Sequence, residues 1–315
     1  MVRARITVVG GFVMELIFQA PRRPDPGETV LGTAFEMAPG GKGFRQAVAA
    51  SRADGKVVAI GRMGQDDFGD ALLKRLVNEG VETRWLLRDP AHGTAVTSPL
   101  VIANEHDSLI AVPRANLALS VEDVSRATQV LANSGVVLLH LEAPLAVNRS
   151  AAALGHNGGA KVIFNATPYN GQKLSDDFLK LVDILIVSAR VAPLLVGHAP
   201  GAAIEPAAQA LRVRGARRVI VTQGAAGCMM VARHGVYTYP GFAVDVRDET
   251  GAGDAFCGAL AVAVAEQQPY AHALRFANAA GALACTVPGT VPAMPTRYAI
   301  EQLLHKQEAG AKVEE

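Results

Sequence analysis

The feature that most constrains the fold is an alternation of short apolar runs with longer amphipathic segments, which becomes regular from Val57 onward. Parallel strands need long crossover connections, so this alternation predicts right-handed βαβ units around a buried, mostly parallel sheet. An earlier run, Ile6 to Val9, predicts the first strand. Later strands are expected at 57–60, 85–87, 136–141, 162–164, 184–187 and 218–222, and helices at 66–79, 121–132, 147–157, 176–181, 205–214, 252–266, 270–286 and 298–306.

Composition limits the classes of function. Half of the 315 residues are hydrophobic, 19% are charged and the net charge is +1, which accommodates one large α/β domain or two ordinary ones. Without a run of Lys or Arg, neither a nucleic acid nor a membrane surface is an expected partner, and the ligand should be small. The apolar runs are too short for a signal peptide or a membrane span. Three widely spaced cysteines without a C-x-x-C pair predict free thiols and a cytoplasmic protein.

The stretch Asp248–Phe256 joins a turn of small residues to an acid, Asp254, and then to an apolar helical pattern at 256–264. Such a turn points backbone N–H groups at one place, which suits a phosphate, and the adjacent acid can take a proton. These two capacities indicate phosphoryl transfer to a hydroxyl. The alternative is that Asp254 only caps a helix.

A second glycine-rich turn, Pro39-Gly-Gly-Lys-Gly, leads into a helical pattern that continues to Arg52. Backbone donors and Lys42 therefore gather at a helix start, which again suits an anion. The turn lacks the G-x-x-x-x-G-K-[ST] pattern of a P-loop. The alternative is a tight turn before a packed helix.

The segments 40–47 and 248–256 together resemble the two signatures of the ribokinase family of carbohydrate kinases, and the resemblance extends over residues 6–305. It implies a three-layer α/β/α domain with a small β-sheet lid formed by residues near 14–35 and 94–112. We therefore expect a single domain at 1–308, with 309–315 as a frayed tail. In the family the lid closes over the sugar and often pairs subunits, so a homodimer through the lid is expected.

By the same resemblance, Asp254 is the catalytic base, which takes the proton of a sugar hydroxyl as that oxygen attacks the γ-phosphate of ATP. Gly251, Ala252 and Gly253 would form the hole for the developing negative charge. Gly41, Lys42 and Glu142 would bind the sugar, although Glu142 could also be an ordinary surface acid after a strand.

The resemblance also assigns a nucleotide side. Mg²⁺-ATP is the expected donor, bound by Ser188, Thr222, Gly224, Gly227 and Asn278. Asn278 would lie near adenine, or would be an amide on a helix surface.

The family often holds a monovalent cation beside the anion hole. The matching positions are Asp248 and Thr250 with the carbonyls near Ala284, Val287 and Gly289. Oxygen donors alone suit K⁺. Asp248 could instead cap the turn.

Three departures from the family pattern concern the acceptor pocket and Mg²⁺. Val13 and Glu15 stand where the family has an Asn and an Asp, and Arg45 stands where it has an Asn, so Glu15 and Arg45 join the predicted substrate-binding residues. Arg45 would suit an acidic or phosphorylated acceptor, or would pair with Glu15. The third departure is that the segment 188–191 lacks the acid of an Asn-x-x-Glu motif. Arg190 there would neutralise phosphate, or lie in solvent.

The sequence therefore predicts an ATP-dependent phosphotransferase that acts on a hydroxyl of a small sugar or sugar-like acceptor. The alternatives are a nucleoside kinase of the same family, a catalytically impaired sensor that binds a sugar or nucleotide, and an α/β domain with neither activity. Substitutions at Val13, Arg45 and Val191 motivate the sensor, whereas the intact turn at 251–254 favours the kinase.

Overall fold

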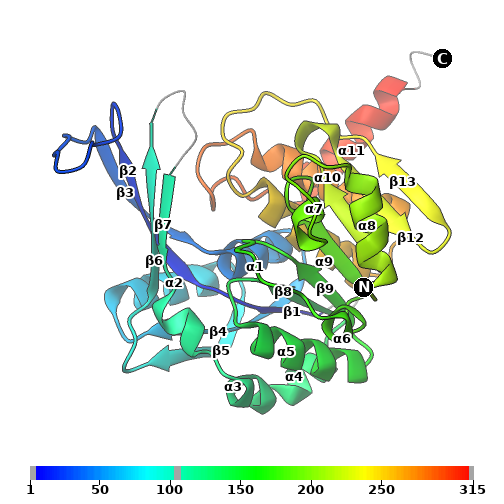
Figure 1. The fold of residues 1–315 in the computed structure, drawn as a ribbon, viewed down its shortest axis with the longest axis horizontal. Helices are drawn as coiled ribbons and strands as arrows, with labels where there is room; N and C mark the ends of the chain where they lie inside the picture. The colour runs from blue at the N-terminus through cyan, green and yellow to red at the C-terminus, as the bar shows by residue number, and fades with distance from the viewer. Residues whose placement is uncertain (1–4, 103–107, 312–315) are drawn as a thin grey trace.

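A computed structural model describes residues 5–102 and 108–311. Its centre is a nine-stranded sheet in the order β13-β12-β11-β10-β9-β8-β1-β4-β5, with helices on both faces (Figure 1). Pairing is parallel from β5 through to β11, as the βα alternation predicts, and antiparallel from β11 to β13. The strands are β1 (Arg5–Val9), β4 (Lys56–Gly64), β5 (Glu82–Asp89), β8 (Val136–His140), β9 (Lys161–Asn165), β10 (Ile184–Ser188), β11 (Arg218–Thr222), β12 (Cys228–Ala232) and β13 (Gly235–Tyr239).

Each central strand is apolar on both sides because it separates two cores. In β8, Val136 and Leu138 belong to one buried cluster, whereas Val137 and Leu139 belong to the other. The first cluster includes residues of helices α1 (Lys42–Arg52), α2 (Asp67–Asn78), α9 (Ala252–Ala265), α10 (Tyr270–Ala284) and α11 (Arg297–Ala311). The second includes residues of α3 (Val121–Arg126), α4 (Thr128–Ala132), α5 (Leu145–Asn157), α6 (Asp176–Leu179), α7 (Val191–Leu195) and α8 (Ile204–Val213). The result is the predicted three-layer arrangement.

A separate four-stranded sheet, in the order β3-β2-β6-β7, projects from one end of the molecule and is called the lid below (Figure 1). Its strands are β2 (Val13–Gln19), β3 (Ala34–Gly40), β6 (Ala95–Val101) and β7 (Ser108–Val112). The first lid segment was expected near residues 14–35, but its second strand, β3, begins only at Ala34 and continues to Gly40. It pairs with β2 in the register Phe18↔Phe35. As an edge strand, β3 tolerates Pro39 because one of its sides needs no partner.

Other element boundaries also differ from the predicted ones. The helix expected at 121–132 is divided into α3 and α4, because Ala127 between them has φ −93° and ψ 15°. Helix α7 was not predicted, and α11 runs on to Ala311. Residues 312–315 of the expected frayed tail lie outside the described residues. Among the described residues, no helix combines the length and apolar character that a membrane crossing requires.

Candidate active site

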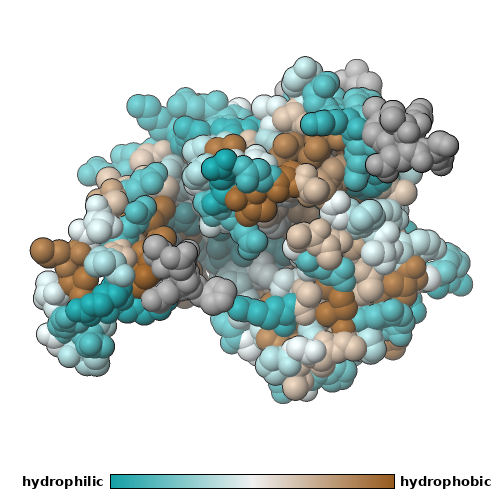
Figure 2. All heavy atoms as spheres, turned by 90° about the horizontal axis from the view of Figure 1, so that it is seen from above, coloured by the Kyte–Doolittle hydropathy of each residue, from teal (hydrophilic) through white to brown (hydrophobic). Residues whose placement is uncertain are grey.

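The candidate site lies where β1 and β8 end, beside the starts of α1 and α9. Gly10, Gly11 and Phe12 connect β1 to the lid strand β2. The backbone is closely packed there, since a Cβ on Gly10 would lie 1.7 Å from Nε2 of His140. Only glycine lets the backbone approach this closely. Figure 2 shows a hollow between the lid, at the left, and the rest of the molecule.

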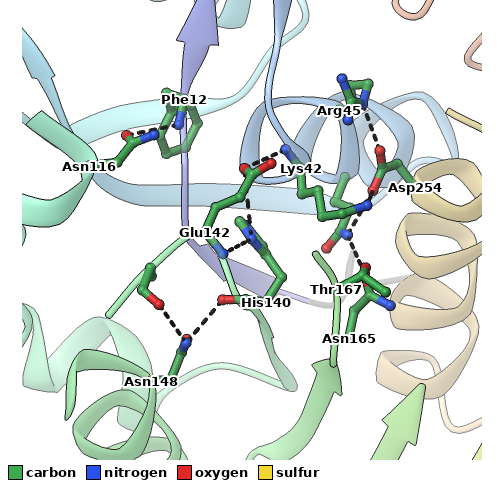
Figure 3. A network of polar contacts seen from close by, with 12 residues as sticks. Phe12, Lys42, Arg45, Asn116, His140, Glu142, Asn148, Asn165, Thr167 and Asp254 are labelled. Carbon is green, nitrogen blue, oxygen red and sulfur yellow. Dashed lines mark hydrogen bonds and ion pairs between the residues drawn. The ribbon is translucent and has the colours of Figure 1, made fainter. Parts of the chain in front are cut away.

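Helix α1 starts from a glycine in a left-handed conformation, since Gly41 has φ 86°. A Cβ on Gly41 would lie 2.9 Å from the carbonyl oxygen of Gly11, so the turn also packs tightly against the β1–β2 connection. The N–H of Lys42 donates to Oε2 of Glu142 at 2.7 Å (Figure 3). The predicted sugar-binding residues from α1 and from the end of β8 are thus neighbours.

Helix α9 also begins at a left-handed glycine, Gly251, with φ 86°. Asp254 occupies its first turn and is only 2% exposed. A Cβ on Gly253 would meet no atom within 4 Å, so this part of the turn borders open space. The start of an α-helix leaves backbone N–H groups unpaired and favours negative charge. The geometry therefore places a buried carboxylate beside a surface suited to phosphate.

Three donors from α1 contact the Asp254 carboxylate, and Figure 3 shows two of them, Lys42 and Arg45. Nε of Arg45 donates to Oδ2 at 2.6 Å, Nε2 of Gln46 donates to Oδ1 at 2.9 Å, and Nζ of Lys42 lies 3.5 Å from Oδ1. Burial acts to raise the pKa of Asp254, but the Lys42 and Arg45 charges outweigh it and hold the pKa at about 2. Asp254 is therefore an anion at neutral pH.

Arg45 has a second carboxylate partner, Glu15 of the lid strand β2, whose Oε1 lies 2.6 Å from Nη1. Burial acts to lower the pKa of Arg45, but Asp254 and Glu15 raise it above its ordinary value. Of the two alternatives for Arg45, pairing with Glu15 is the one observed. Because two carboxylates already balance the guanidinium, the site offers an acidic acceptor no unpaired charge at Arg45.

Glu142 differs from Asp254 in its protonation. Burial raises the pKa of Glu142 to about 7, and the charges of Arg45 and Lys42 oppose this shift only in part. The neighbouring His140 is fully buried, and burial together with the Lys42 charge lowers its pKa to about 3, so its ring is neutral. The N–H of Glu142 donates to Nδ1 of that ring at 3.3 Å. Glu142 is therefore no ordinary surface acid.

The protonation of Glu142 gives a testable pH dependence. A carboxylate accepts hydrogen bonds from hydroxyls better than a neutral carboxyl does, so kcat/KM for the acceptor should rise as pH increases through about 7. Since the pKa is raised from 4.5 on folding, the stabilisation from the bound proton is complete below about 4.5 and is lost as pH rises through about 7.

Initial rates and thermal melts of wild type and Glu142→Gln between pH 5 and 8 check this prediction. The variant should lose both the rise in kcat/KM and the fall in stability. Glu79→Gln is the control, because Glu79 pairs with Arg52 at 2.7 Å outside the site and should leave both profiles unchanged in shape. A Glu142→Gln profile that matches wild type would contradict the assignment.

The predicted nucleotide residues Ser188 and Thr222 end the adjacent strands β10 and β11, where they are partners in register. Oγ of Ser188 accepts a hydrogen bond from the Val191 N–H at 3.3 Å, and Oγ1 of Thr222 donates to the Val187 carbonyl at 3.4 Å. The carboxyl ends of parallel strands are the usual edge for ligands in open α/β sheets.

Gly224 and Gly227 form the turn that follows β11, with φ values of 59° and 92°. The Gly227 N–H donates to the Gly224 carbonyl at 2.9 Å, which closes the turn. The structure thus puts all four of the predicted residues 188, 222, 224 and 227 at the same sheet edge or directly after it.

Asn278 is buried in α10, with 7% exposure, so the alternative of a surface amide is wrong. Its Nδ2 donates to the carbonyls of Tyr239 and Pro240 at 3.1 and 3.2 Å. These bonds connect α10 to the last residue of β13 and to the residue after it. A contact of Asn278 with adenine stays a prediction.

Asp248 holds together the turn before α9. Its Oδ1 accepts from the Thr250 N–H at 2.9 Å and its Oδ2 accepts from the Gly289 N–H at 3.0 Å, so it does cap the turn. The segments before α9 and after α10 therefore meet, which brings the predicted cation residues 248, 250, 284, 287 and 289 into one region. A bound monovalent cation remains a prediction.

Sequence reasoning missed two residues that support the Asp254 carboxylate. Gln46 contacts Asp254 directly, and its Nε2 also donates to Oδ1 of Asn165 at 3.3 Å. The available signal was helical spacing, since 42, 45 and 46 are separated by three and four residues and lie on one face of α1. Asn165 ends β9, and no local pattern marks it.

Comparison with known proteins identifies the family. The model of the pfkB family of carbohydrate kinases matches residues 3–297. Ribokinases of Haemophilus influenzae and Bacillus subtilis are 32% and 33% identical, covering 94% and 95% of this chain and 96% and 99% of their own. A deoxyribokinase of Salmonella typhi is 30% identical over 92% of this chain and 95% of its own. Arabidopsis thaliana ribokinase, solved with ribose and ATP, has a TM-score of 0.88 at 27% identity, with 96% and 99% of the chains covered. These matches show that the chain belongs to the pfkB family of carbohydrate kinases.

Proposed function

We propose that the protein transfers the γ-phosphate of ATP to a hydroxyl of a small sugar, with Asp254 as the base. The observation that carries this proposal is the ionised, 2% exposed Asp254 at the start of α9, next to a glycine turn that borders open space. In phosphoryl transfer the protein mainly positions the reactants and balances charge, and this arrangement can do both.

In the proposed reaction, Asp254 and the residues around it have separate roles. The acceptor hydroxyl donates to the carboxylate, which receives its proton as the oxygen attacks the γ-phosphate. In this proposal the backbone N–H groups of Gly251, Ala252 and Gly253 stabilise the charge that develops on the transferring oxygens, and the Ala252 N–H, which donates to the Glu249 carbonyl at 3.3 Å, would change partner. Lys42, 3.5 Å from Oδ1, supplies positive charge to the same region.

Mg²⁺ neutralises phosphate charge when it accompanies ATP. The protein offers Mg²⁺ few side-chain ligands. Val191 replaces the expected acid, and the described residues contain no cluster of three His, Cys, Asp or Glu side chains placed to hold a metal. We infer that Mg²⁺ would depend on the phosphates and water for its ligands. Arg190 is exposed at the start of α7, which leaves its role toward phosphate open to test by substitution.

The acceptor class follows from the relatives and from one apolar residue. We infer a pentose, because the similar proteins include ribokinases and a deoxyribokinase. A Cβ on Gly41 would lie 2.9 Å from Cγ2 of Val13, so a methyl group lies beside the glycine turn that the sugar would contact. A methyl group offers a hydroxyl no hydrogen bond. This favours 2-deoxyribose as a second candidate acceptor.

A panel of acceptors tests the proposal. ADP formation from Mg²⁺-ATP should be stimulated by ribose or 2-deoxyribose, and less by hexoses and nucleosides. Preference for a nucleoside would support the alternative kinase, and tight sugar binding by calorimetry without turnover would support the sensor. Repeating the assay with K⁺, Na⁺ or neither tests the proposed cation at Asp248, where K⁺ should give the highest rate.

The lid supports the proposed homodimer. Phe18, Phe35, Met37 and Ile110 are 44%, 55%, 56% and 70% exposed, and the strand registers put them on one face of the sheet. A clustered apolar face of this kind is typical of an interface. Sedimentation should give a dimer for wild type and a monomer for Phe18→Glu.

We also propose that the chain forms a single domain and that the protein is located in the cytoplasm, where its three cysteines would stay reduced.

A further inference from the structure

We propose that Arg45 is a positioning residue, which uses Glu15 of the lid as an anchor to hold the Asp254 carboxylate in place for catalysis. This inference rests on the proposed function, since Asp254 is the proposed base. It gives Arg45 a role toward the base rather than toward the acceptor. The evidence is a chain of contacts that connects three separate elements.

The first part of that evidence is the geometry of the guanidinium. Arg45 is 9% exposed and uses two different nitrogens, Nε for Oδ2 of Asp254 and Nη1 for Oε1 of Glu15, each at 2.6 Å. The planar fork of an arginine is rigid, so fixing Nη1 on the lid strand also fixes the direction of Nε. The orientation of Asp254 on α9 is therefore coupled to β2.

The second part is that the two carboxylate oxygens of Asp254 have different partners. Oδ2 accepts a hydrogen bond from Arg45, whereas Oδ1 accepts a longer one from Gln46 at 2.9 Å and lies 3.5 Å from Nζ of Lys42. The strongest contact therefore fixes one oxygen and leaves the more weakly held Oδ1 for an acceptor hydroxyl. A carboxylate that turned freely would present its oxygens in many directions, and positional errors of about 1 Å can cost about 10²-fold in rate.

The third part is electrostatic. The charged and titratable groups near Asp254 are Lys42 and Arg45 from α1, Glu15 from β2, His140 and Glu142 from the end of β8, and Cys257 from α9 itself. Of these, Lys42 and Arg45 lower the pKa of Asp254. Glu15 partly balances Arg45, which limits how far the guanidinium weakens Asp254 as a base.

Kinetics of Arg45→Gln and Arg45→Lys test the proposal. Arg45→Gln should lower kcat by about 10- to 10²-fold with a smaller change in acceptor KM. Loss of the cation should also raise the pKa of Asp254 by about one unit or more, which moves the acidic limb of kcat to higher pH. Arg45→Lys keeps the charge without the fork, so it should lower kcat but leave that limb near its wild-type position.

Arg52→Gln is the matched control, because Arg52 lies on the same helix and its Nε and Nη2 bind the Glu79 carboxylate at 2.8 and 2.7 Å. It should lower thermal stability without moving the pH profile. Glu15→Gln should also lower kcat, because it removes the anchor. The double variant Glu15→Gln with Arg45→Gln should be no slower than Arg45→Gln alone, since both changes act through one contact.

A direct titration separates this inference from the proposed function. The ¹³C carboxyl signal of Asp254, assigned by comparison with Asp254→Asn, should titrate at higher pH in Arg45→Gln than in wild type, whether or not any acceptor is turned over. If Arg45→Gln changes only the acceptor KM and leaves both kcat and this titration unchanged, Arg45 binds the acceptor and the inference is overturned. If the titration shifts but no variant phosphorylates any acceptor, the coupling stands and the proposed function fails.

Discussion

Replacing Asp254 with asparagine is expected to lower kcat by roughly 10²- to 10⁴-fold, the range typical of losing a positioned general base. Asparagine has nearly the same shape, and its oxygen can still accept from Arg45 or Gln46, but it cannot take a proton from the acceptor. The change should therefore act on kcat more than on KM. Steady-state rates with saturating ATP and varied acceptor measure both quantities.

Asp183→Asn is a suitable control, because Asp183 is also buried, at 2% exposure, and also has basic partners, Arg217 and Lys161. It precedes β10, at the amino end of the sheet and so at the opposite edge from the site. This variant should lose stability and keep its kcat at 25 °C. Asp254→Asn with more than about a tenth of wild-type kcat would refute Asp254 as the base.

Gly258→Ala is expected to damage stability and activity together, because Gly258 is where α9 packs against α1. A Cβ there would lie 2.6 Å from Cβ of Ala49, 2.7 Å from the Ala50 nitrogen and 2.8 Å from the Gln46 carbonyl oxygen. Two of these atoms belong to the backbone, so the helices must separate. Overpacking of this kind typically costs about 1–3 kcal/mol. It also moves Asp254 away from its partners on α1, so kcat should fall.

Gly253→Ala is the matched variant on the same helix. A Cβ there meets nothing within 4 Å, so the folding stability should stay the same or rise by up to about 1 kcal/mol, the helix preference of Ala over Gly. Chemical denaturation of both variants provides the comparison. If Gly258→Ala proved as stable as wild type, close packing of α9 on α1 would not be what fixes the distance between Asp254 and α1.

The layers of the fold and the two glycine turns were predictable because their signals are local. Buried parallel strands show as continuous apolar runs, and left-handed turns show as glycines, of which Gly41 and Gly251 are examples. The position of β3 was not predictable in this way. Its neighbours in the sheet decide where that edge strand begins: β2 ends at Gln19, which pairs with Ala34, so the strand pairing stops there.

The site was predictable only in its parts. Motifs marked Asp254, Lys42 and Glu142, but the contact between Arg45 and Asp254 joins residues 209 positions apart. No periodic pattern in the sequence predicts a contact between residues that are so far apart along the chain. The same limit explains Asn278, because a buried amide between two backbone carbonyls and an exposed one look identical in a helical pattern.

The residues proposed to bind the acceptor and those proposed to bind ATP come from different stretches of the sequence. This separation has a consequence for laboratory evolution. The proposed acceptor residues all lie between 15 and 142, whereas the transfer turn and the proposed nucleotide residues all lie between 188 and 289. A gene library confined to the first stretch can therefore vary the sugar contacts, provided that the residues of α1 that contact Asp254 are held fixed. These residues are Lys42, Arg45 and Gln46.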